Sequence, residues 1–175
     1  MADIKHGVVR TDKMYGTDTG VNLVSAKYFT TVDNKEVETE IDNGNVLKVG
    51  NLLAGEREVR KATTPAANTA LKEIILVATP EVMYDEHKKA LHEFYNEAGA
   101  IVRGYFLHEH DYFSLTADAL TIAAGAEVAV GWAVELMAGT KMKVVATATN
   151  GSTQVGKIAA IEQSGRYTYY VVEVA

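Results

Sequence analysis

Hydrophobic and polar positions alternate along this chain in short runs. The clearest alternation covers residues 127–136, in which every second residue from Val128 to Leu136 is a large apolar one. A period of two is typical of a half-buried β-strand. Residues 119–139 are the most apolar stretch, but the alternation and the acidic Glu127 and Glu135 favour a core strand over a membrane-spanning helix.

The same texture predicts further strands, separated by glycine, asparagine or proline. The expected strands are residues 46–49, 57–61, 74–77, 105–108, 112–115, 127–136, 141–148, 155–163 and 166–174. Asn150-Gly151 is a dipeptide typical of hairpin turns. No helical pattern separates the last four strands, so a parallel βαβ arrangement is disfavoured. The pattern therefore predicts a mainly β fold, a compact antiparallel barrel or sandwich.

One segment has helical spacing and predicts a short helix. Asp85 is placed to cap its start and Gly99 to end it. The apolar residues that would share one face are Tyr84, Leu91, Phe94, Tyr95 and Ala98.

The first 45 residues differ in composition from the rest. They are rich in Thr, Asp, Asn and Lys and contain few apolar residues, so they bury little by themselves. We expect residues 1–45 to form an extended N-terminal arm and residues 46–175 a single β-rich domain. The arm is either a mobile tail or a segment that adds strands to a neighbouring subunit. Tyr15 and Tyr28 favour the second interpretation, because mobile tails seldom carry aromatic anchors.

Charge and composition argue against several classes of function for this protein. The 175 residues carry a net charge of -6 without a basic run, whereas binding to nucleic acid needs a basic surface. No direct nucleic-acid contact and no membrane contact are expected. The absence of cysteine excludes disulfides and thiolate chemistry and fits folding in a reducing cytoplasm. The charged N-terminus lacks the apolar core of a signal peptide.

Catalytic motifs are weak. His108 and His110 lie two apart, so on a strand they would point to one side and could share a metal with Asp111, His87 or His92. The alternative is a polar turn that leads into the 112–115 strand. No serine lies in a Gly-x-Ser-x-Gly elbow. We therefore expect no catalytic residue, metal or cofactor.

Aromatic residues are the candidates for an interface. Tyr167 and Tyr169 would face one side of the last strand, which either packs within the domain or meets another subunit. The predicted contact residues for a capsid or a second subunit are Tyr15, Tyr28, Phe29, Tyr167 and Tyr169.

Several segments resemble small structural proteins encoded in tailed-phage head gene clusters. The resemblance runs from about Val46 to the C-terminus and is least close before it. The segments that carry it are residues 78–86, 96–99, 103–105, 111–114 and 165–174, which read Ala-Thr-Pro-Glu-Val-Met-Tyr-Asp-Glu, Asn-Glu-Ala-Gly, Arg-Gly-Tyr, Asp-Tyr-Phe-Ser and Gly-Arg-Tyr-Thr-Tyr-Tyr-Val-Val-Glu-Val.

The resemblance implies a non-enzymatic role in the virion, similar to that of decoration or cement proteins. Such proteins bind the outer surface of the bacteriophage capsid and stabilise the shell. The implied partners are the major capsid protein and neighbouring copies of the chain, and the implied location is the capsid surface after synthesis in the host bacterial cytoplasm. Two alternatives stay open: a tail, connector or fibre-base component, and a small metal-dependent enzyme that uses the 108–111 histidines.

Overall fold

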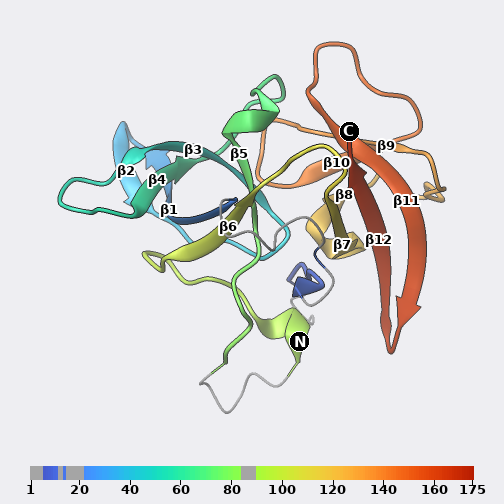
Figure 1. Cartoon of the computed structure of the whole chain (residues 1–175), viewed down its shortest axis with the longest axis horizontal. Coiled ribbons are helices and arrows are strands. Elements are labelled where there is room, and N and C mark those ends of the chain that lie inside the picture. The colour runs from blue at the N-terminus through green and yellow to red at the C-terminus, as the bar shows by residue number, and fades with distance from the viewer. Residues whose placement is uncertain (1–5, 12–13, 15–21, 84–89) are drawn as a thin grey trace.

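The computed structural model describes residues 6–11, 14, 22–83 and 90–175, and these form a mainly β protein built from two six-stranded sheets. The elements are β1 (Leu23–Val32), β2 (Lys35–Glu38), β3 (Val46–Leu52), β4 (Val59–Thr63), η2 (Leu71–Glu73), β5 (Ile74–Val77), η3 (Leu91–Glu93), β6 (Val102–Phe106), β7 (Tyr112–Thr116), η4 (Ala117–Ala119), β8 (Leu120–Thr121), β9 (Ala133–Glu135), β10 (Met142–Val145), β11 (Gln154–Ser164) and β12 (Tyr167–Val174). The predicted β class is confirmed (Figure 1).

The first sheet closes into a five-stranded barrel. Its strand order is β2-β1-β4-β3-β5-β6, and β1 also pairs with β6, so β1, β4, β3, β5 and β6 form a ring. The β1–β4 pairing is parallel, and the other pairings of this sheet are antiparallel. Closure leaves none of the five barrel strands with a fully open edge. β2 lies outside the ring and pairs with the end of β1 in a hairpin.

β5 is buried on both faces, which explains why its sequence reads as an unbroken apolar run. Ile75 and Val77 lie in the cluster that fills the barrel, whereas Ile74 and Leu76 lie in the larger cluster outside it. Gly104 of β6 lies over Ile75, and a Cβ at this glycine would come within 2.4 Å of the Ile75 Cδ1 atom. The glycine is therefore a packing requirement of the barrel.

The second sheet is a curled half-barrel that covers the outside of the barrel at β5. Its order is β7-β12-β11-β9-β10-β8, with β8 and β10 parallel and the other pairs antiparallel. Buried side chains such as Phe113 and Val172 of this sheet pack in the same cluster as Ile74 and Leu76. The two sheets therefore share one hydrophobic core. The long β11–β12 hairpin extends beyond it (Figure 1).

The predicted boundary of the N-terminal arm differs from the structure. Residues 23–38 are not an arm, because β1 is a barrel strand between β4 and β6 and β2 pairs with it. Nearer the N-terminus, Val8 and Val9 are buried, and the backbone of residues 8–10 hydrogen-bonds to β7. The described part of the arm thus folds onto its own chain. The polar composition concealed this role because few side chains of β1 face the core.

Two other predicted elements are also corrected. Only Ala133–Glu135 of the expected 127–136 strand is a strand, since Gly131 turns the chain with a φ of 90° and Val130 is exposed. The expected helix has no counterpart at its described end, where Leu91–Glu93 is a single 3-10 turn and Phe94 is extended. The start of that helix, residues 84–89, lies outside the described residues. No helix in the described part of the chain is long and apolar enough to span a membrane.

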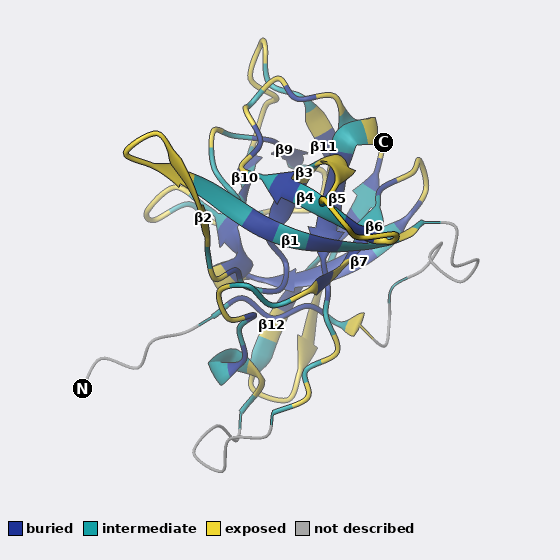
Figure 2. Cartoon of the chain, turned by 90° about the vertical axis from the view of Figure 1, so that its left-hand side faces the viewer, coloured by how far each residue is buried: buried dark blue, intermediate teal, exposed yellow. Residues whose placement is uncertain are grey.

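The β1–β2 hairpin extends away from the barrel. Its turn residues Asp33 and Asn34 have φ values of 49° and 60°, as a two-residue type I′ turn requires. Val32 and Val37 on this hairpin are exposed apolar residues. Figure 2 shows β2 and its turn as an exposed projection next to β1, whose middle residues are buried or half-buried.

Candidate functional site

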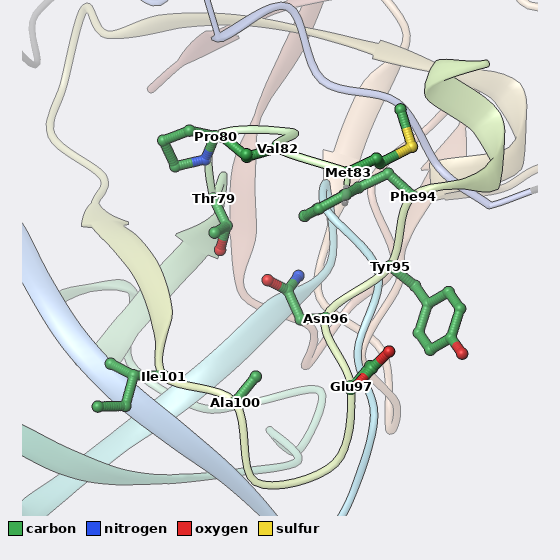
Figure 3. A pocket seen from close by; sticks show the side chains of 10 residues that line it. All are labelled: Thr79, Pro80, Val82, Met83, Phe94, Tyr95, Asn96, Glu97, Ala100 and Ile101. Atoms are coloured by element: carbon green, nitrogen blue, oxygen red, sulfur yellow. The ribbon is translucent and has the colours of Figure 1, made fainter. Parts of the chain in front are cut away.

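Two of the segments singled out in the sequence, residues 78–86 and 96–99, contribute side chains to one pocket. The pocket has a volume of about 660 Å³ and is bordered by the segment that follows β5 and by the loop between η3 and β6. Its lining residues are Thr79, Pro80, Val82, Met83, Phe94, Tyr95, Asn96, Glu97, Ala100 and Ile101. Figure 3 shows the Asn96 side chain directed toward Thr79, between the two segments.

The side-chain amide of Asn43 holds the first of these segments in place, because it hydrogen-bonds to the backbone of Thr79. The Asn43 Nδ2 donates to the Thr79 carbonyl oxygen at 2.7 Å, and the Thr79 N–H donates to Asn43 Oδ1 at 3.0 Å. The same Nδ2 lies 3.3 Å from Oε1 of Glu81. Only 1% of Asn43 is exposed. These bonds satisfy both ends of a buried amide, which is what burial of such a group requires.

Asn96 joins the second segment, the loop between η3 and β6, to Ile41 and Asn43. The Asn96 Nδ2 donates to the Ile41 carbonyl at 3.0 Å and to Asn43 Oδ1 at 3.2 Å, and the backbones of Ile41 and Asn96 exchange two hydrogen bonds of 2.9 Å. We call Asn43, Thr79 and Asn96 with their bonds the amide clamp. Asn96 and Thr79 belong to the resembling segments, so in this fold those segments hold strands and loops together.

The described side chains that line the pocket are mostly apolar. Its apolar lining includes Pro80, Met83 and Ile101, and among the described lining residues Glu97 is the one acidic side chain. Tyr95 stacks on the His6 ring at a centroid distance of 4.9 Å, which ties the N-terminal segment to the pocket rim. The described lining contains no nucleophile with an adjacent base.

A second group of polar and aromatic residues lies where the tip of the β11–β12 hairpin meets η3. The Arg166 guanidinium lies 5.3 Å from the Tyr167 ring centroid and its Nη2 lies 3.3 Å from His92 Nδ1. The Tyr167 hydroxyl is 3.0 Å from the same nitrogen. Because a guanidinium can only donate, His92 Nδ1 is the acceptor. These contacts connect η3 to the hairpin and border a smaller recess of about 280 Å³.

The four predicted interface residues that the structure describes do not share one surface. Tyr15 lies outside the described residues. Tyr28 is buried in the barrel, and its hydroxyl lies 2.8 Å from Thr64 Oγ1. Tyr169 is 2% exposed and lies beneath the Arg10 guanidinium. Neither ring is therefore accessible for contact in the single chain. The reason is that the N-terminal segment and the barrel wall cover them.

Phe29 and Tyr167 are half-buried and lie on different sheets. Phe29, on β1, has the Lys61 ammonium 5.9 Å from its ring centroid, and Lys61 also contacts Glu36 of β2. Tyr167 begins β12. For these two residues the interface assignment stays a prediction.

The 108–111 segment is the polar turn that was the alternative to a metal site. Asp111 is buried, and its Oδ2 accepts the His108 N–H at 2.9 Å, while the Asp111 N–H returns a bond to the His108 carbonyl. His110 adopts a φ of 71°, so it sits at the corner of the turn. No group of three or more His, Cys, Asp and Glu side chains that could hold a metal occurs among the described residues, and His87 is outside them.

Two carboxylates have shifted pKa values. Burial acts to raise the pKa of Glu135, but hydrogen bonds of 2.7 Å from the Thr149 hydroxyl and N–H, with Lys143 at 3.5 Å, outweigh it, so this pKa lies below its ordinary value. Hydrogen bonds from Lys157 and Tyr112 lower the pKa of Glu173. Both carboxylates are ionised and bonded to neighbouring strands or turns, which is a structural role.

Comparisons with known proteins add no family. Neither protein-family models, nor curated proteins, nor solved structures matched this chain. The amide clamp was not predicted from the sequence, because its partners are 36 and 53 residues from Asn43. The sequence did single out two residues of the clamp, because Thr79 and Asn96 lie in residues 78–86 and 96–99, two of the segments that carry the resemblance.

Proposed function

We propose that this chain is a non-enzymatic virion protein that binds the outer surface of a tailed-phage capsid and stabilises the shell. Its partners in this proposal are the major capsid protein and adjacent copies of the chain on the capsid lattice. The resemblance of residues 78–86, 96–99, 103–105, 111–114 and 165–174 to head-cluster structural proteins is its first support.

The observation that carries the proposal is where those resembling residues lie. Thr79 and Asn96 belong to the amide clamp, Gly104 admits Ile75 into the barrel, and Phe113 is in the shared core. Residues that maintain a fold are what a structural protein needs, whereas an enzyme family would be expected to share catalytic side chains. The likeness is therefore of a kind that suits a shell component.

The shape suits a bridging role. The β1–β2 and β11–β12 hairpins extend on opposite sides of the molecule (Figure 1), and each presents exposed apolar residues, Val37 on the first and Ile161 on the second. A protein that holds neighbouring capsid subunits together needs two separated contact surfaces. The net charge of -6 suits the outer face of the shell, away from packaged DNA.

Co-sedimentation tests the proposal. The purified full-length chain is mixed with expanded capsids that lack it, and the bound amount is measured against concentration. A chain that starts at Val46 is a poor test, because it lacks β1 and would open the barrel. Point variants preserve the fold better: Val37→Lys and Ile161→Lys each place a charge on one hairpin, and Leu52→Lys places the same charge on an exposed apolar site of the barrel.

We expect saturable binding by the natural chain and by Leu52→Lys, and weaker binding by both hairpin variants. Replacing an apolar contact at an interface by a charge typically costs about 1–3 kcal/mol, which is about a 5- to 150-fold loss in affinity. Failure of the natural chain to bind capsids at any concentration would refute the proposal. Closed rings of the free protein on size-exclusion chromatography, without capsid binding, would instead support a tail or connector role.

A further inference from the structure

The sequence contains two Asn-Gly dipeptides, Asn43-Gly44 and Asn150-Gly151. The first is buried in the fold and the second is exposed. Asn-Gly is chemically fragile because glycine has no side chain to hinder attack of its backbone nitrogen on the preceding side-chain amide. From the contrast between the two sites we propose that Asn150 is a site of spontaneous deamidation in the folded protein and that Asn43 is protected.

The reaction needs only the chain and water. The Gly151 backbone nitrogen attacks the Asn150 Cγ atom, loses its proton, and expels ammonia to form a five-membered succinimide. Water then adds to one of the two imide carbonyls and opens the ring. Opening at one carbonyl gives aspartate, and opening at the other gives isoaspartate, in which the main chain runs through the former side chain. No oxidation or reduction occurs, and the product carries one additional negative charge.

The turn that contains Asn150 leaves the reacting groups accessible. Asn150 and Gly151 are both exposed. The Ser152 N–H donates to the Thr149 carbonyl at 3.2 Å, and Gly151 has a φ of 88°, so these four residues form a β-turn with Gly151 as its third residue. In such a turn the closing bond uses the N–H of the fourth residue, and the N–H of the third residue points to solvent. That N–H is the one that must attack.

Space around the turn also permits ring closure. A Cβ built on Gly151 would meet no atom within 4 Å, so no neighbouring segment crowds that side of the turn. No hydrogen bond to the Asn150 side chain occurs within the described part of the structure. The side-chain amide is thus free to reach the following nitrogen.

The Asn43 side chain, by contrast, is buried and hydrogen-bonded. Both ends of its side-chain amide are bonded to Thr79 in the amide clamp, and Asn96 adds a further bond. The Gly44 N–H, which would have to attack, donates to the Val77 carbonyl at 2.8 Å. The site is buried, so reaction there requires the clamp to open first, and the free energy of that opening slows the reaction.

The change at Asn150 would have a structural consequence. The neighbouring Thr149 supplies the N–H and hydroxyl that bind the buried Glu135 carboxylate. An isoaspartate adds an atom to the backbone next to Thr149, and either product places a new negative charge near that carboxylate. We expect the altered turn to weaken the hold on Glu135.

The test is peptide mapping of the full-length chain after incubation in mildly alkaline buffer. Trypsin releases residues 36–48 with Asn43 and residues 144–157 with Asn150, and fragmentation by mass spectrometry locates the amide-to-acid mass gain. A second sample is incubated in urea, where the clamp is absent. Isoaspartate is detected with an isoaspartyl methyltransferase.

We expect Asn150 to react at least about tenfold faster than Asn43 in the folded protein, since 1.4 kcal/mol of opening free energy already gives that ratio. In urea the two rates should become similar. The variant Asn150→Gln should remove the modification from the 144–157 peptide. Equal rates at both sites in the folded chain, or an Asn150 that reacts only in urea, would overturn the proposal.

Discussion

Replacement of Asn43 by alanine tests the amide clamp. The substitution removes two bonds to the Thr79 backbone, at 2.7 and 3.0 Å, and the acceptor of the second Asn96 bond. A buried polar group left without its partner costs about 1–3 kcal/mol. Thr79 is only half-buried, so water recovers part of the loss. For the Thr79 N–H and carbonyl together we expect a decrease of about 2–4 kcal/mol in the free energy of unfolding.

The decrease is measurable by urea denaturation and by heating. In a domain of this size, 1 kcal/mol shifts Tm by about 2–4 °C, so Tm should fall by about 5–15 °C. Asn51→Ala is the matched control, because Asn51 is exposed on β3 and its replacement should change stability by less than about 0.5 kcal/mol.

Asn43→Asp separates hydrogen bonding from side-chain volume. Aspartate has nearly the shape of asparagine but would turn an acceptor oxygen toward the Thr79 carbonyl and the Glu81 carboxylate. We expect it to be at least as destabilising as alanine. If both Asn43 variants unfold at the same urea concentration as Asn51→Ala, the clamp does not stabilise the fold and our account of the resembling segments is wrong.

Three further outcomes follow from the structure. Gly104→Ala should lower the unfolding free energy by about 1–3 kcal/mol in urea titrations, because its Cβ would approach Ile75 within 2.4 Å, and unchanged stability would show that the barrel has room there. Asn34→Gly should raise stability by about 0.5–1 kcal/mol, since glycine adopts the φ of 60° more readily, and a lower Tm would contradict this. The lowered pKa of Glu135 means that its stabilisation is present above the unfolded-state pKa and is lost as pH falls through the folded-state pKa. Glu135→Gln should therefore be less stable than the natural chain at neutral pH, with the difference narrowing in acid, and a difference that is constant across pH would refute the assignment.

The sequence predicted the β class and several strands because their burial follows a local pattern. The apolar run of β5 and the run of tyrosine and valine in β12 both identify a strand from neighbouring residues alone. β1 was missed as a barrel strand because its pairing with β4 is parallel and non-local, and few of its side chains face the core. The 127–136 alternation was misleading because a glycine turn interrupts it and because Glu135, which reads as a surface residue, is buried against Thr149.

The candidate site was harder to predict than the fold. Tyr28 and Tyr169 appeared to be interface residues because tyrosine is common at interfaces, but each is covered by a segment far away in the sequence. Asn43 gave no signal of its own, since a lone asparagine before glycine reads as a turn. Long-range hydrogen bonds and coverage by remote segments are set by the tertiary fold, so no local pattern records them.

Electron cryomicroscopy of expanded capsids with and without the added protein would show whether and where the chain binds the shell. We expect extra density on the outer surface of the shell, into which the barrel and half-barrel fit, with the β1–β2 and β11–β12 hairpins each contacting a different capsid subunit. Density on the inner surface, density confined to the portal or tail, or no added density under saturating protein would contradict it.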